Sequence, residues 1–183
     1  MSVTIAKWTL EEYHRMIEAG ILDDRRVELL RGEIVEMPPE GEPHAFDSNQ
    51  AFKYLLNLLE GLADVRGAKP ITLPNQSEPE PDLAIVQDLG REYREHHPYP
   101  ENIFWLIEYS NSSPSKDLGI KRKIYAEVGI SEYWIVDLKR LQLIVLRDPQ
   151  DGDYRSETTL TTGTIAPLAF PEISISVDRI LNS

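Results

Sequence analysis

The hydrophobic positions of the chain change between helical and strand spacing, and this predicts a mixed α/β fold. Leucines and one phenylalanine recur at helical spacing over 44–62, which predicts a long amphipathic helix with one face on the core. The continuous apolar run 103–107 is typical of a strand buried on both faces. The other predicted elements are a helix over 9–19 that Thr9 and Glu12 begin as a capping box, a hairpin of 27–30 with 34–37, strands over 70–73, 83–86, 132–137 and 141–146, weak strands near Tyr154 and Ile165, and a last helix over 177–181.

The second half of the chain predicts how the sheet is connected. A helix over 116–128 separates the strands 103–107 and 132–137, and this order is a βαβ crossover with parallel strands. The strand 141–146 follows a short turn and is expected to pair antiparallel with 132–137. Residues 87–102 are polar and are expected to form a surface excursion. We expect one domain over 1–183, with a mixed sheet flanked by helices.

Composition narrows the class of protein. The 183 residues include 31 acidic and 19 basic side chains, a net charge of −12, which argues against a tight, purely electrostatic grip on duplex DNA. The absence of cysteine excludes disulfides and thiolate zinc sites, and fits a reducing compartment. No apolar run approaches the ~20 residues of a membrane span, and the start of the chain lacks a secretory signal. We expect a cytoplasmic protein without a membrane partner.

Two carboxylates break the pattern of their own segments, as functional residues often do. Asp82 stands directly before the apolar strand 83–86. Glu108 follows five apolar residues of the strand 103–107, where a buried charge requires a partner.

A third charged position follows from the geometry of the helix 116–128. With about 100° per residue, its apolar side chains, among them Ile120 and Ile124, centre near 290° and Lys121 falls at about 300°. Asp117 lies one turn earlier on the same face, so Lys121 could simply pair with it. The crossover, however, lays this helix across the strand of Glu108. Two carboxylates and an ammonium would then form a site for a hard cation such as Mg²⁺.

The order of Pro81-Asp82, an apolar strand, Glu108 and a helix with Lys121 resembles the PD-(D/E)xK nuclease superfamily. The longer runs resemble its Uma2-type branch, a family of restriction endonucleases, over nearly the whole chain. These runs are TLEEY from Thr9, VEL from Val27 with GEI from Gly32, Pro38, His44, EPEPDLAIV, IEYSNSSPSKDLGIKRKIYAEVGI and EYWIVD.

The resemblance implies a restriction-endonuclease-like fold with one Mg²⁺ site, where Mn²⁺ would substitute. Asp82 and Glu108 would be its ligands and Glu28 would add a ligand or hold a water, while Asp82, Glu108 and Lys121 would be the catalytic residues, Asp117 positioning the lysine. The superfamily lysine is expected two residues after the glutamate, but Ser110 stands there, so the following helix would supply the ammonium.

Three functions stay open on these residues. The first is metal-dependent hydrolysis of phosphodiester bonds in DNA, with RNA or branched DNA as further substrates. The second is a catalytically degenerate nuclease fold that serves as a binding or structural component, as a homodimer; the net charge of −12 favours it. The third is a glycosidase-like acid and base pair of Asp82 and Glu108, which the nearby Lys121 disfavours.

Overall fold

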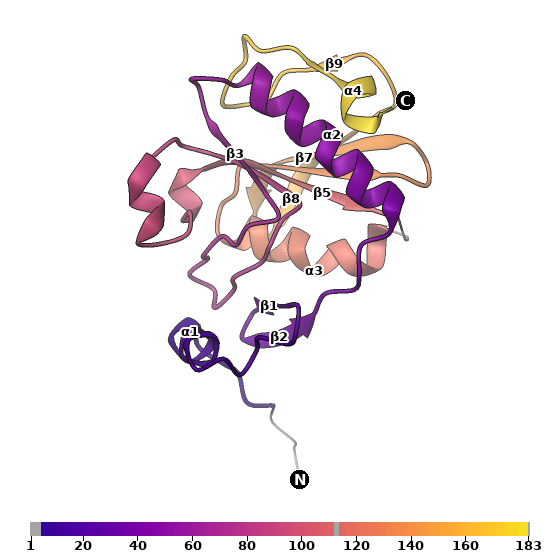
Figure 1. The fold of residues 1–183 in the computed structure, drawn as a ribbon. Helices are drawn as coiled ribbons and strands as arrows, with labels where there is room; N and C mark the ends of the chain where they lie inside the picture. The colour runs from indigo at the N-terminus through magenta and orange to yellow at the C-terminus, as the bar shows by residue number, and fades with distance from the viewer. Residues whose placement is uncertain (1–4, 112–113, 183) are drawn as a thin grey trace.

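A six-stranded mixed sheet forms the centre of the computed structural model, which describes residues 5–111 and 114–182, and of 114–118 only the backbone. The strand order is β3-β4-β5-β6-β7-β8 (Figure 1). Neighbouring strands are antiparallel except β5 and β6, which are parallel. The strands are β3 Asp64–Gly67, β4 Leu83–Val86, β5 Ile103–Ser110, β6 Glu132–Asp137, β7 Gln142–Gln150 and β8 Asp153–Leu160.

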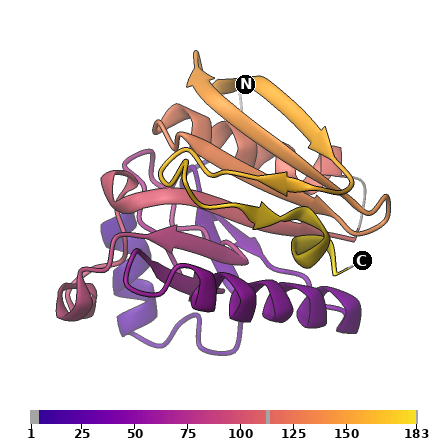
Figure 2. The same cartoon turned by 90° about the horizontal axis from the view of Figure 1, so that it is seen from above.

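Helices cover both faces of this sheet (Figures 1 and 2). The crossover helix α3 (Pro114–Glu127) packs on one face, where Ile124 and Tyr125 join a buried cluster with Leu106 and Tyr133. The helices α2 (Glu42–Leu58) and α4 (Val177–Leu181) pack on the other face, against side chains such as Trp105. Alternate residues of β5 therefore point into two different cores, as the period of a strand requires.

Smaller elements complete the structure. The helix α1 (Leu10–Glu18) precedes an antiparallel hairpin, which is joined to the loop before β4 by a bridge between Leu29 and Glu78. This connection holds the hairpin near the start of β4. The other small elements are β1 Val27–Leu30 and β2 Glu33–Glu36 of the hairpin, the antiparallel pair β9 Thr164–Ile165 and β10 Ile175–Ser176, and the 3₁₀ turns η1 Gly90–Arg94 and η2 Pro100–Asn102.

Most predicted elements are confirmed. The strands 83–86 and 132–137 have the predicted bounds, the Thr9 to Glu12 capping box is formed, and β5 and β6 are parallel across α3. The long helix begins and ends earlier than predicted, at Glu42 and Leu58. Within the part of the chain that is described, no helix is both long and apolar enough to cross a membrane.

The predicted strand over 70–73 is wrong. Ile71 and Leu73 are fully buried, but this segment makes only one isolated bridge, between Leu73 and Ser77. Its apolar residues reflect burial of a loop in the core. The strand next to β4 is instead β3, whose single buried apolar residue, Val65, gave no strand pattern. Ile120, placed on the buried arc of its helix, is 52% exposed.

Candidate active site

A cleft of about 930 Å³ opens between the β1–β2 hairpin, the start of α2, the end of β5 and the helix α3. All four predicted site residues line it, so the fold brings them together. Its described lining holds seven carboxylates and four basic side chains: Glu28, Glu33, Glu36, Glu40, Glu80, Asp82 and Glu108 with Lys7, Arg26, Arg31 and Lys121. The cleft is therefore acidic, and a bound phosphate requires a compensating cation.

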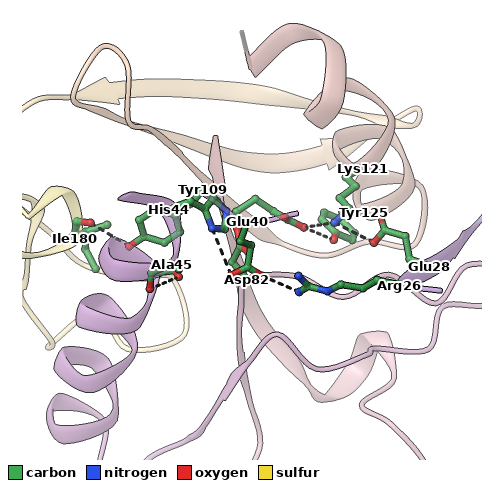
Figure 3. Close-up of polar contacts among 12 residues, drawn as sticks. Arg26, Glu28, Glu40, His44, Ala45, Asp82, Tyr109, Lys121, Tyr125 and Ile180 are labelled. Carbon is green, nitrogen blue, oxygen red and sulfur yellow. Dashed lines mark hydrogen bonds and ion pairs between the residues drawn. The ribbon is translucent and has the colours of Figure 1, made fainter. Parts of the chain in front are cut away.

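Lys121 lies between two carboxylates at the floor of this cleft (Figure 3). Its Nζ donates to Oε1 of Glu108 at 2.9 Å and is 3.1 Å from Oε2 of Glu28. The side chains of Lys121, Glu108 and Glu28 are only 10%, 6% and 7% exposed, respectively. The hydroxyl of Tyr125, one turn further along α3, donates to the same Glu108 oxygen at 2.9 Å. The prediction that α3 points a lysine into the protein is confirmed.

The predicted partner of this lysine on its own helix, Asp117, has a side chain outside the described residues. The two described partners come from distant elements, Glu108 from β5 and Glu28 from β1. Oε2 of Glu28 also accepts from the backbone N–H of Glu80 at 3.2 Å, which fixes its orientation.

Burial and charge shift the pKa values of this pair. Desolvation raises the pKa of Glu108 to about 7, although the nearby Lys121 ammonium opposes the shift. Burial alone lowers the pKa of Lys121, but the carboxylates of Glu108 and Glu28 outweigh it and hold that pKa above its usual value. Lys121 is therefore charged at neutral pH. Glu108 is the group of this pair whose proton can be exchanged near pH 7.

Asp82 lies beside Glu108 because β4 and β5 are antiparallel neighbours, with Leu83 opposite Ile107. The next position of this antiparallel ladder places Asp82, just before β4, opposite Glu108 near the end of β5. Both positions lie on the face of the sheet that α3 covers. The Asp82 Oδ2 accepts from the backbone N–H of Tyr109 at 2.6 Å and lies 3.1 Å from Nε2 of His44. The hydrogen bond to Asp82 raises the pKa of His44, against the effect of burial.

Glu40 and His44 complete a second set of donors around Asp82 (Figure 3). Arg26 donates to Oε1 of Glu40 at 2.7 Å, and Oε2 of Glu40 lies 4.0 Å from Nδ1 of His44. One ligand atom from each of Glu40, His44 and Asp82 lies within 4.8 Å of the others. Among the described residues, this is the one group of three that could converge on a metal ion.

The predicted ligands therefore lie in two adjoining clusters. Asp82 belongs to the donor group with Glu40 and His44, whereas Glu108 and Glu28 contact Lys121. The sequence-based reasoning missed Glu40 and used His44 only as a mark of the family. Their spacing of four residues across the start of α2 is the signal that could have found them.

This arrangement has a defined chemical capacity. Carboxylate oxygens and an imidazole can bind a divalent cation, and a buried ammonium next to them can stabilise negative charge on a substrate oxygen.

Comparison with known proteins identifies the family and the fold of the chain. A family model described as "Uma2: Putative restriction endonuclease" matches residues 10–178. A solved structure titled as a "putative nuclease belonging to DUF820" from Anabaena variabilis ATCC 29413 superposes with a TM-score of 0.74 at 16% identity, covering 95% of this chain and 97% of that chain. No curated protein matches. The structural likeness confirms the predicted fold class.

Proposed function

This chain belongs to the Uma2 restriction endonuclease family, and from that membership we propose that it is a metal-dependent endonuclease that hydrolyses phosphodiester bonds in DNA. One observation carries the proposal: a charged, nearly buried lysine lies against Glu108 in a cleft that Asp82 also lines. Carboxylates that can hold a cation and a fixed ammonium suit phosphoryl transfer, because the reaction spreads negative charge over the phosphate oxygens.

The proposed cation is Mg²⁺, with Mn²⁺ as a substitute, and Asp82 and Glu108 would hold it. The donor set fits, because carboxylate oxygens are the ligands that Mg²⁺ prefers and the lining of the cleft is predominantly acidic. Glu28 would add a ligand or hold a water. When bound, such a cation neutralises phosphate charge and lowers the pKa of a coordinated water.

Lys121 supplies the positive charge that comes from the protein and not from the cation, and this charge stabilises negative charge on the substrate. Its raised pKa keeps it protonated, and its contacts with Glu108 and Glu28 fix the position of the ammonium. A preorganised charge of this kind needs no reorientation when negative charge develops on the substrate. Tyr125 acts as a positioning residue, because its hydroxyl holds the Glu108 oxygen that Lys121 also contacts.

The acidity of the cleft fits this function when a cation is present. Seven carboxylates against four basic side chains repel a phosphate backbone. We therefore expect DNA binding that is weak, sensitive to salt and dependent on the divalent cation.

The test is cleavage of supercoiled plasmid, single-stranded and branched DNA in Mg²⁺ or Mn²⁺. We expect the wild-type protein to cleave, and Asp82→Asn and Glu108→Gln each to lower the rate by at least about 100-fold. Asp88→Asn is the matched control, because Asp88 is an exposed carboxylate just beyond the other end of β4.

Two results would reject the proposal. Equal rates for the wild-type protein and the Asp82 and Glu108 variants would assign any cleavage to a contaminant. No cleavage by a folded wild-type protein that still binds the cation would favour the degenerate, binding function instead.

A further inference from the structure

We infer that Glu40, His44 and Asp82 form a second cation site at the start of α2, next to the site proposed for Asp82 and Glu108, and that this second site binds through an imidazole nitrogen and prefers Mn²⁺ over Mg²⁺. The inference rests on the proposed function only for the use of the cation in catalysis. Binding of the cation is a separate property and is tested without DNA.

The spacing of the three donors suits one ion. Their ligand atoms lie within 4.8 Å of one another. Octahedral bonds of about 2.1 Å place neighbouring ligand atoms about 3 Å apart and opposite ones about 4.2 Å apart. Rotation of the Glu40 side chain, which is 32% exposed, can close the remaining difference without movement of the backbone.

Nε2 is the nitrogen of His44 that faces Asp82. It lies 3.1 Å from Oδ2 of Asp82, close to the separation of about 3 Å between neighbouring ligands of an octahedral ion. Nδ1 lies on the other edge of the ring, 4.0 Å from Oε2 of Glu40. An ion shared with Asp82 would therefore be bound through Nε2 and would replace the hydrogen bond between His44 and Asp82.

Each of the three ligands is also held from outside the group, as is usual at metal sites. Arg26 binds the other oxygen of Glu40 and leaves Oε2 facing His44. The backbone N–H of Tyr109 holds Asp82, and the ring of Tyr109 packs edge-on against the imidazole with 6.0 Å between ring centroids. Two residues outside the group, Arg26 and Tyr109, therefore restrict the positions of its three donors.

The ligand types decide which metal is favoured. Carboxylates bind Mg²⁺, Ca²⁺ and Mn²⁺, whereas an imidazole favours transition metals. One imidazole with two carboxylates therefore favours Mn²⁺ over Mg²⁺.

The experiment measures Mn²⁺ binding to the full chain by electron paramagnetic resonance, with pulsed detection of directly coordinated ¹⁴N. We expect the wild-type protein to bind Mn²⁺ with a ¹⁴N signal, and at least about tenfold more tightly than Mg²⁺ measured by competition. His44→Ala should lose the ¹⁴N signal and weaken Mn²⁺ binding by at least about tenfold, because even loss of an outer-shell partner weakens metal sites by about 10- to 100-fold.

The matched control is His96→Ala. His96 also faces a carboxylate four residues away, with 3.7 Å between its Nε2 and Glu92, but it belongs to no group of three donors in the described chain. This variant should keep both the affinity and the ¹⁴N signal. Circular dichroism checks that each variant is folded, and Glu40→Gln, which should also weaken Mn²⁺ binding, replaces His44→Ala if that variant does not fold.

The outcomes separate the two proposals. No Mn²⁺ binding by the wild-type protein, no ¹⁴N signal, or unchanged affinity in the His44 variant overturns the inference. If DNA is cleaved and the His44 variant binds Mn²⁺ normally, the proposed function stands without it. If the ¹⁴N signal is present and DNA is not cleaved, the metal site stands and the nuclease function fails.

Discussion

Replacement of Lys121 by methionine tests the electrostatics of the cleft most directly. Methionine keeps an unbranched apolar side chain of similar length but removes the ammonium that lies between Glu108 and Glu28. The two carboxylates then share a buried region with one positive partner fewer. We expect the folded state to lose several kcal/mol of stability at pH 8.

The size of this effect follows from the geometry. With an effective dielectric constant of about 20, the ammonium attracts carboxylates at 2.9 Å and 3.1 Å by about 6 and about 5 kcal/mol. Desolvation of the three nearly buried groups, several kcal/mol for each ion, offsets most of that attraction in the wild-type protein. Removal of one partner leaves the desolvation of the others uncompensated, which typically destabilises a protein by about 3 to 5 kcal/mol.

The loss should depend on pH. Burial raises the pKa of Glu108 to about 7 in the folded protein, above its ordinary value of 4.5. The folded state therefore holds a proton that the unfolded state releases between these values, and this contribution to stability falls as the pH rises. Near pH 5.5 Glu108 is protonated with or without Lys121, so only Glu28 loses a counter-charge. We expect the effect of the substitution to shrink to less than half of its value at pH 8.

Urea unfolding at pH 5.5 and pH 8 gives these free energies, and a second substitution gives the coupling. Glu108→Gln combined with Lys121→Met should recover at least half of the loss at pH 8, because the buried excess charge is then smaller. Lys123→Met is the control on the exposed side of the same helix and should change stability by less than about 0.5 kcal/mol. A loss below about 1 kcal/mol at pH 8, or equal losses at both pH values, would refute the reasoning.

Three further predictions concern single contacts. Tyr125→Phe removes a hydrogen bond to the Glu108 carboxylate and should destabilise the protein by about 2 kcal/mol in urea unfolding; an unchanged midpoint would show that the bond is not formed. Arg147→Met leaves the fully buried Glu132 without its guanidinium and should lower stability by about 3 kcal/mol without changing Mn²⁺ affinity; a change in affinity would contradict its place outside the cleft. Thr9→Ala removes a helix cap and should lower stability by about 1 kcal/mol, whereas Thr9→Ser should restore it; equal stability of Thr9→Ala and the wild-type protein would deny the cap.

Local sequence patterns predicted most of the fold. The capping box at Thr9, the apolar strands 83–86 and 132–137 and the parallel crossover between β5 and β6 depend on neighbouring residues, and all are present. The apolar pattern predicted the wrong element where a buried segment does not pair with the sheet, and where a paired strand has few apolar residues. The apolar residues of 70–73 fill the core from a loop, and the mostly polar β3 pairs along the edge of the sheet.

The sequence by itself also determined which charged residues of the cleft need partners. Asp82 directly precedes one apolar segment and Glu108 directly follows another, and Lys121 lies on the buried side of its helix, so their charges required partners. The identity of those partners was decided by the tertiary structure. Lys121 meets carboxylates 13 and 93 positions away in the chain, because the crossover lays α3 over β5 and the β1–β2 hairpin brings Glu28 to the same cleft.

The donor group around Asp82 likewise depends on the tertiary structure. His44 lies 38 positions before Asp82, and only the packing of α2 against the sheet brings the imidazole within 3.1 Å of the carboxylate. Helical and strand periodicity describes which face of an element is buried, but it carries no information on which two buried faces meet. That choice is made by the whole core, and with it the ligands that we propose for a metal ion.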